Sequence, residues 1–275
     1  MRFFLTILAL GLLAFTWTKN PDKPVAEVPQ EVRPQPEAPT PQVESSELLN
    51  QIVSTADSSK CAQYSFKGQG KAPKGYLRGV ALSYARAACN GVELPTGGTD
   101  ATDALVHFGI STDDDLRATY ALLIGHGMRE SSGRWCVGKD PGATNTSAET
   151  CEAGLFQTSL NSTYKKPYMM DFYKSVKANP EGCFFSVYSK DISCSASNLK
   201  NWGTGEGVAF QKLSKDCPGF ATDYAARMIR VGRKHYGPLY NTSKYKAEFR
   251  HECFDMLGEV KKLVKANPTT CLSLR

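Results

Sequence analysis

One carboxylate of the chain stands at a helical position where an apolar side chain would be expected. Apolar residues recur on one face of the segment from Leu116 to Met128. At about 100° per residue, the spacing from Leu116 to Glu130 returns to within about 40° of that face. Glu130 should therefore be partly desolvated, which favours a protonated carboxyl group. Such a group can act as the general acid that protonates a glycosidic oxygen. The alternative is a helix-end glutamate that simply reaches solvent.

Two short motifs, residues 130–133 (ESSG) and 153–159 (AGLFQTS), together resemble the soluble lytic transglycosylases and goose-type lysozymes of the lysozyme-like superfamily. In that group a Glu-Ser pair ends a helix, and a Gly-Leu-Met-Gln segment follows it along the cleft. Phe156 stands where the family usually has methionine. Residues 203–210 (GTGEGVAF) and 220–226 (FATDYAA) are also similar to goose-type members. The resemblance covers the middle of the chain, about residues 116–236.

The resemblance implies that the chain cleaves peptidoglycan between N-acetylmuramic acid and N-acetylglucosamine, with Glu130 as a single general acid and base. After donating its proton, Glu130 would take one from water, as in a muramidase, or from the sugar's own C6 hydroxyl group, as in a lytic transglycosylase. The resemblance also implies substrate binding by Ser131, Phe156, Gln157 and Tyr224. Of these, Tyr224 would contact the catalytic carboxylate, or else be a core aromatic residue. No cofactor and no metal are expected.

The segment between the two motifs is longer than is usual in the family. It contains three acids that could supply a second carboxylate or line the rim of the cleft: Asp140, Glu149 and Glu152. Solvated loop charges are the alternative interpretation. Cys136 and Cys151 flank the insertion, so we expect a disulfide between them that pins it on the rim. The Ala-Tyr-Asn-Ala-Gly segment of many bacterial members is absent from the sequence.

Two other functions stay open at this point. A non-catalytic domain that binds the cell wall or another glycan would use the same cleft, and a chitinase-like or chitosanase-like hydrolase could use the same fold. A cysteine hydrolase would need a thiolate close to a histidine. The four histidines form no recognisable pair with a cysteine in the sequence.

The chain divides into three parts by composition. Residues 1–19 resemble a signal peptide or an uncleaved N-terminal anchor, and residues 20–46 form a Pro/Glu-rich linker that we expect to be disordered. We expect residues 47–275 to form the lysozyme-like catalytic domain. The 275 residues are 41% hydrophobic with a net charge of +6. The basic domain indicates either an anionic partner or simply a solvated surface whose lysine excess aids solubility. We expect an exported monomer, in the periplasm, the cell envelope or outside the cell. Its expected partners are peptidoglycan glycan strands and not nucleic acid.

Nine cysteines, all in the predicted folded domain, suit disulfides in an oxidising compartment. None has the close Cys-x-x-Cys or Cys-x-x-His spacing of a zinc site. Because nine is odd, at least one thiol is unpaired or bonds to another molecule. Cys183 and Cys194 would also close a short loop, and Cys253, on an apolar helical stripe, is interpreted as a buried thiol.

The remaining signals are mostly helical. Apolar spacing predicts helices over residues 77–88, 116–130, 208–213 with a restart at Pro218, and 245–263. A helix start is expected at residues 111–115 (STDDD), where hydroxyl and carboxylate side chains gather. Residues 184–188 (FFSVY) are the best strand candidate. We therefore expect a mainly α fold of the α+β lysozyme-like type, a helical domain with a small hairpin region beside the active-site cleft.

Overall fold

The computed structural model describes residues 47–95, 101, 105–106, 109–111, 114–140, 142–145, 147–232, 248–271 and 274. The predicted signal peptide or anchor (1–19) and the linker (20–46) lie outside these residues. The chain from Val43 to Arg275 forms one compact unit. Within the described part of the chain, no helix combines the length and the apolar character needed to cross a membrane.

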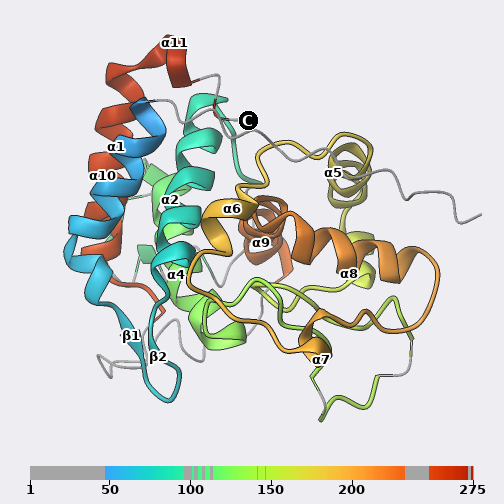
Figure 1. Cartoon of the computed structure of the whole chain (residues 1–275). Coiled ribbons are helices and arrows are strands. Elements are labelled where there is room, and N and C mark those ends of the chain that lie inside the picture. The colour runs from blue at the N-terminus through green and yellow to red at the C-terminus, as the bar shows by residue number, and fades with distance from the viewer. Residues whose placement is uncertain are drawn as a thin grey trace, which may run out of the picture. The chain divides into compact units, whose positions relative to one another are not determined.

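The unit is mainly helical, as predicted, and is built around a central helix, α2 (Lys74–Cys89). Small residues on α2 allow its neighbours to approach closely: a Cβ atom on Gly79 would lie 2.4 Å from the ring of Tyr188. The elements packed on α2 are α1 (Glu47–Ser58), α4 (Asp115–Ser131), α6 (Phe185–Tyr188), α9 (Pro218–Gly232), α10 (His251–Ala266) and α11 (Pro268–Cys271) (Figure 1).

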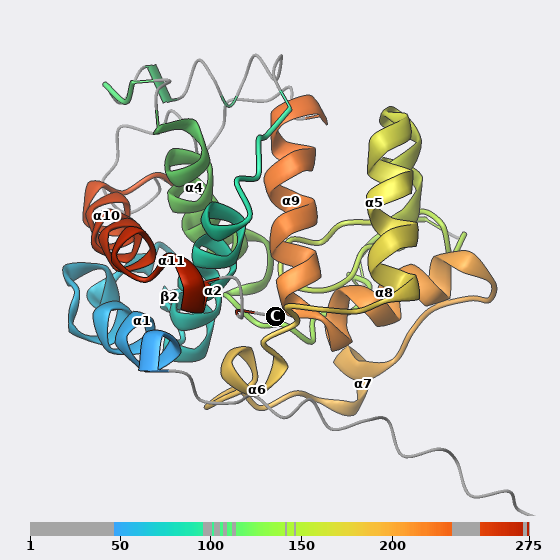
Figure 2. The same cartoon turned by 90° about the horizontal axis from the view of Figure 1, so that it is seen from above.

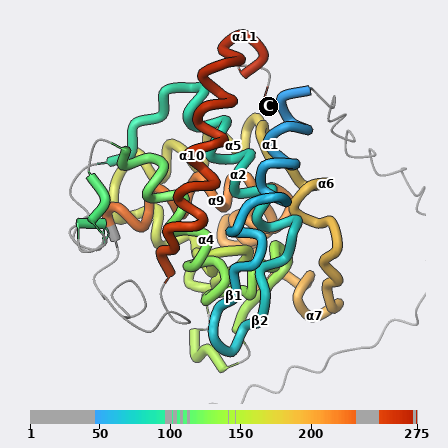
Figure 3. Tube along the Cα trace, turned by 90° about the vertical axis from the view of Figure 1, so that its left-hand side faces the viewer, coloured from blue at the N-terminus to red at the C-terminus, as the bar shows by residue number. Residues whose placement is uncertain are grey.

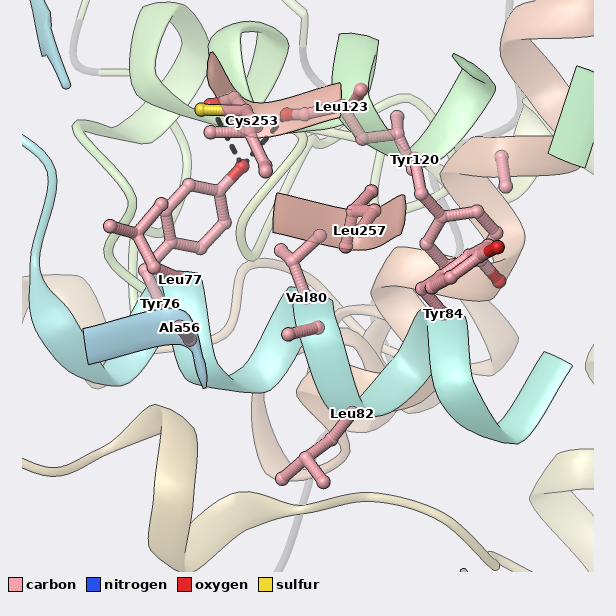
Figure 4. Close-up of a cluster of buried hydrophobic side chains, with 14 of the residues drawn as sticks. Ala56, Tyr76, Leu77, Val80, Leu82, Tyr84, Tyr120, Leu123, Cys253 and Leu257 are labelled. Atoms are coloured by element: carbon pink, nitrogen blue, oxygen red, sulfur yellow. Dashed lines mark hydrogen bonds between the residues drawn. The ribbon is translucent and has the colours of Figure 1, made fainter. Parts of the chain in front are cut away.

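The core between α2, α4 and α10 fixes the position of α4 (Figure 4). Tyr76 points from α2 toward α4, and its hydroxyl group lies 2.7 Å from the carbonyl oxygen of Leu123 and 3.1 Å from that of Ile124. Further along the same two helices, the rings of Tyr84 and Tyr120 meet edge to face with centroids 5.7 Å apart. These buried contacts hold α4 against α2, and with it the residues at the end of α4.

A second, aromatic core lies between α9 and three further elements: η3 (Leu160–Lys165, a 3-10 helix), α5 (Pro167–Ala178) and α8 (Glu206–Asp216). Its largest side chains are Tyr173, Phe210, Phe220 and Tyr224. Seen from above, α9 lies between α5 and the pair α2 and α4 (Figure 2). Pro218 opens α9, which confirms the predicted restart, because proline fits the first turn of a helix.

A small antiparallel hairpin follows the 3-10 helix η1 (Lys60–Gln63). Its strands are β1 (Ser65–Phe66) and β2 (Gly70–Lys71), with Ser65 opposite Lys71. The hairpin lies at the end of the unit where α4 terminates (Figure 3), and Gln69 in its turn accepts a hydrogen bond from the hydroxyl group of Ser132. The expectation of a mainly α fold with a small hairpin is therefore confirmed.

All nine cysteines lie in the described part of the chain. Four disulfides join Cys61–Cys253, Cys89–Cys271, Cys136–Cys194 and Cys183–Cys217, and Cys151 is free and buried. The predicted bonds Cys136–Cys151 and Cys183–Cys194 are wrong, and Cys253 is not a free thiol. The prediction paired cysteines that are close in the sequence, whereas the true partners meet only when distant elements pack together. Four disulfides indicate folding in an oxidising compartment.

The strand predicted at residues 184–188 is also wrong, because these residues form α6. Its last residue, Tyr188, is buried, and its hydroxyl oxygen lies 3.0 Å from Oγ of Ser83 and 2.7 Å from Oγ1 of Thr222. Tertiary packing of this aromatic residue outweighs the local strand preference. A second short helix, α7 (Ala196–Leu199), follows on the way to α8.

The predicted helix starts were close to those observed. Helix α4 begins at Asp115, inside the expected acidic start, but Asp114 does not cap it. Its carboxylate instead pairs with Arg117 at 2.6 Å and with Lys261 at 2.8 Å. The last long helix, α10, begins at His251, later than the stripe from residue 245 suggested, and residues 245–247 lie outside the described part.

Candidate active site

Glu130 lies in the last turn of α4. The helix ends there because Ser132 (φ 57°) and Gly133 (φ 69°) adopt left-handed conformations. The backbone N–H groups of these two residues donate to the carbonyl oxygens of Met128 and Gly127, each at 3.1 Å, which closes the helix as a Schellman motif. The side chain of Glu130 is 27% exposed. It is thus partly buried while still reaching solvent.

Ser131 joins the two motifs that the sequence analysis singled out. Its side chain is buried, and its hydroxyl oxygen lies 2.7 Å from the carbonyl oxygen of Leu155 and 3.0 Å from that of Gly127. Gly154, the residue before Leu155, is closely packed against the backbone of Ser214: it has φ 77°, and a Cβ atom on it would lie 2.7 Å from the carbonyl oxygen of Ser214. The end of α4 and the segment 153–159 are therefore packed together, although Ser131 itself faces the protein.

Glu130 belongs to a cluster of four charged or titratable side chains. Its Oε1 atom lies 3.3 Å from Nη1 of Arg129 and 3.7 Å from Nδ1 of His126. The same two nitrogen atoms lie 3.6 Å and 3.5 Å from Oε1 of Glu248, whose side chain has no exposed surface. Arg129 and His126 are thus shared between a partly exposed and a fully buried carboxylate, and the negative charge of Glu248 offsets the positive charge of Arg129.

His126 is held in this cluster by its neighbours on both sides. Its ring stacks on that of Phe156, with centroids 6.0 Å apart and an interplanar angle of 19°. Two flanking glycines make room: a Cβ atom on Gly125 would lie 2.0 Å from the carbonyl oxygen of Glu248, and one on Gly127 would lie 2.2 Å from the hydroxyl oxygen of Tyr76. Phe156 is 2% exposed. The expectation that Phe156 packs beside the glycan is therefore corrected, because this ring lies beneath the surface and supports His126.

The other two residues expected to bind substrate have different surroundings. The side-chain amide nitrogen of Gln157 donates to the carbonyl oxygen of Gly154 at 3.0 Å, and the residue keeps part of its surface exposed. Tyr224 is buried in the aromatic core, and its hydroxyl oxygen lies 2.6 Å from Oγ of Ser162. Among the hydrogen bonds of the described residues, none joins Tyr224 to Glu130, so its expected contact with the catalytic carboxylate is corrected to a core role.

Of the three rim acids, Glu152 is the one that interacts electrostatically with Glu130. Burial by the surrounding protein raises the pKa of the Glu152 carboxyl group, and the negative charges of Glu130 and Asp140 raise it further. Glu152 nevertheless keeps contact with solvent. The Asp140 carboxylate accepts a hydrogen bond of 2.8 Å from the backbone N–H of Gly142. Glu149 is exposed, and among the described contacts none brings its carboxylate to Glu130.

Sequence reasoning missed Glu248 and undervalued His126. The signal for His126 was its place between two glycines, one helical turn before Glu130. Glu248 had no comparable signal, because it lies far along the chain and is brought to α4 by the packing of α10. Within the described residues, no group of three or more histidine, cysteine, aspartate or glutamate side chains could hold a metal ion.

Comparisons of this chain with protein-family models, with curated proteins and with solved structures gave no match.

Proposed function

We propose that this protein is a glycosidase that cleaves the peptidoglycan strand between N-acetylmuramic acid and N-acetylglucosamine, with Glu130 as its general acid. The observation that carries the proposal is the 2.7 Å contact between Ser131 and Leu155, which joins the Glu-Ser pair to the Gly-Leu-x-Gln segment at the end of α4. A motif pair that is separate in sequence and adjacent in space is what a shared site requires.

Glu130 would donate its proton to the glycosidic oxygen as positive charge develops on the sugar ring. Its side chain reaches solvent, so a polymer can approach it. On the buried side of the cluster, the negative charge of Glu248 offsets the positive charge of Arg129. This limits how strongly Arg129 pairs with Glu130. A carboxyl group that is not locked in a full ion pair can hold and release a proton during the reaction.

Glu152 is our candidate for the residue that activates water after the bond breaks. Burial raises the pKa of Glu152, and the negative charge of Glu130 raises it further, so the two carboxylates lie within electrostatic reach of each other. We therefore propose hydrolysis, which leaves a reducing sugar end. A lytic transglycosylase reaction would need no second carboxylate and would leave a 1,6-anhydro end.

The four disulfides and the net charge of +6 support an exported protein that meets an anionic polymer. We propose the bacterial envelope or its surroundings as the place of action.

The direct experiment is digestion of purified peptidoglycan sacculi by the full-length protein, followed by mass spectrometry of the soluble products. Release of muropeptides with reducing ends supports both the cleaved bond and the role of Glu152. Muropeptides with 1,6-anhydro ends would still support cleavage of the glycosidic bond, but they would exclude Glu152 as the residue that activates water. If no soluble muropeptide is released while the protein sediments with sacculi, the protein binds the wall without cleaving it.

A further inference from the structure

Trp202 is a large aromatic side chain at the surface, 43% exposed, on the segment that leads from α7 to α8 (Figure 1). Aromatic residues of this size are usually buried, because each removes a large apolar area from water. Nζ of Lys139 lies 4.4 Å from the centre of the Trp202 ring. The ring is thus positioned by a cation while much of its surface stays open.

The backbone of Trp202 is held rigidly by buried polar groups on α8. The side chain of Gln211 is buried; its Oε1 atom accepts from the N–H of Trp202 at 2.8 Å, and its Nε2 atom donates to the carbonyl oxygen of Trp202 at 3.0 Å. One turn later, the buried Lys215 donates to three consecutive carbonyl oxygens, those of Asn198, Leu199 and Lys200. A surface segment tied down in this way has lost its flexibility before any ligand arrives, which lowers the entropic cost of binding.

A cavity of about 270 Å³ opens beside this ring. Its walls come from two segments, and its lining residues are Lys139, Asp140, Ser197, Lys200, Asn201 and Trp202. The Oδ1 atom of Asn201 is buried and has no hydrogen-bond partner among the described residues. The hydrogen-bonding capacity of this acceptor beside the cavity is therefore unmet. The aromatic ring of Trp202 and the ammonium groups of Lys139 and Lys200 suit a sugar ring that carries a carboxylate, and the Asp140 carboxylate can accept hydrogen bonds from the hydroxyl groups of that sugar.

The cavity is connected to the surroundings of Glu130 through covalent and electrostatic links. The disulfide Cys136–Cys194 joins the segment after α4 to the segment before α7. Asp140, which lines the cavity, is close enough to raise the pKa of Glu152, and Glu130 raises the pKa of the same carboxyl group. Glu152 therefore lies within electrostatic reach both of Glu130 and of the cavity.

We propose that the Trp202 cavity is a remote saccharide-binding subsite, which stacks a sugar ring of the bound glycan on Trp202 and pairs the carboxylate of that sugar with Lys139 and Lys200. This inference rests on the proposed function, because the sugar that carries a carboxylate is the muramic acid unit of the same strand, wherever its lactyl group is not linked to a stem peptide. The cavity adds affinity for longer strands and does not take part in bond cleavage.

Binding is measured by calorimetry on the Glu130→Gln variant, so that the ligand is not consumed. The two probes are peptide-free glycan strands released from peptidoglycan by an amidase, and chito-oligosaccharides of matched length, which lack the carboxylate. On this background, Trp202→Ala should weaken binding of the peptidoglycan strands about tenfold, and Trp202→Phe should restore most of the affinity. Lys200→Gln should weaken binding of the peptidoglycan strands and leave that of the chito-oligosaccharides unchanged.

Leu199→Ala is the matched control, because Leu199 is 48% exposed on the same segment and does not line the cavity. An unchanged melting temperature shows that each variant is folded. Equal affinity of Trp202→Ala and Leu199→Ala for the peptidoglycan strands would overturn the subsite. An equal effect of Lys200→Gln on both probes would overturn the pairing with a carboxylate.

Failure of this inference is distinguishable from failure of the proposed function. If the wild-type protein cleaves sacculi but Trp202→Ala leaves both strand affinity and KM unchanged, the subsite is wrong and the glycosidase stands. If the wild-type protein cleaves nothing but still binds glycan through Trp202, the glycosidase is wrong and the binding site stands.

Discussion

Oε1 of the fully buried Glu248 lies 3.5 Å from Nδ1 of His126, and the same nitrogen atom lies 3.7 Å from Oε1 of Glu130. One imidazole ring thus connects a carboxylate without solvent contact to a carboxylate that a substrate can reach. Because Phe156 stacks on this ring, the position of His126 is fixed by packing as well as by charge.

Glu248→Gln should lower both stability and activity. The substitution removes the buried negative charge that faces Arg129 and His126, so the free energy of unfolding should fall by about 1–3 kcal/mol. Because Glu248 is not exposed to substrate, kcat should fall and its pH dependence should change while KM stays constant. Denaturant unfolding and a pH–rate profile measure these effects, with the exposed Glu252→Gln as control. A variant with wild-type kcat at every pH would show that Glu248 is structural only.

Ser131→Ala should loosen the contact between the two motifs. It removes the hydroxyl group at 2.7 Å from the carbonyl oxygen of Leu155, which should cost about 1 kcal/mol of stability. Activity should fall by more than this loss of stability explains, because Glu130 and residues 153–159 lose their fixed spacing. Ser175→Ala, on the exposed side of α5, is the control for thermal unfolding and initial rates. Equal behaviour of the two variants would contradict the role given to Ser131.

As the pH falls, the contribution of Glu152 to stability should rise while the activity of the protein falls. Burial and the negative charges of Glu130 and Asp140 raise the pKa of Glu152 above its ordinary value, so the folded protein binds this proton more tightly than the unfolded chain does. As pH falls from neutral through the raised pKa, the contribution of Glu152 to stability increases, and this contribution is lost as pH rises again. Activity should fall over the same range, because a protonated Glu152 cannot activate water.

Glu152→Gln should remove this acid limb from the pH–rate profile and reduce the plateau rate by about 10²–10⁴-fold. The measurement is the initial rate of sacculus solubilisation across the acid range, with Glu149→Gln as the matched control. Wild-type rates for Glu152→Gln at neutral pH would exclude Glu152 as the base.

The double variant Cys136→Ser/Cys194→Ser should be destabilised by about 2–5 kcal/mol, because the disulfide closes a long loop. The two cysteines are 58 positions apart in the sequence. Cys151→Ala should cost less, since Cys151 forms no disulfide. Thermal unfolding compares the variants, and peptide mapping without reductant identifies the bond directly. A Cys136–Cys151 peptide in that map would contradict the pairing described above.

The helices could be predicted from the sequence wherever one periodic apolar face decides the structure. The face that runs from Leu116 to Met128 predicted α4, and it also placed Glu130 in the last helical turn. The hydroxyl group of Ser131 and the small residue Gly154 explain why the two motifs meet, and both are visible in the sequence.

Features that depend on distant partners could not be predicted. Glu248 reaches His126 only because α10 packs on α4, and no local pattern encodes that contact. Phe156 was expected at the surface because its segment follows the cleft in the resembling family, whereas here its ring fills the space under His126. The partner of Cys136 is Cys194 for the same reason: the fold, not the sequence interval, sets the distance between them.

The most direct test of the account is the rate of muropeptide release from sacculi by Glu130→Gln, compared with Glu149→Gln and with the wild-type protein. Glu130→Gln should release no muropeptide, sediment with sacculi as the wild-type protein does and keep its melting temperature, while Glu149→Gln should stay active. Muropeptide release by Glu130→Gln at the wild-type rate would contradict the assignment of Glu130 as the general acid.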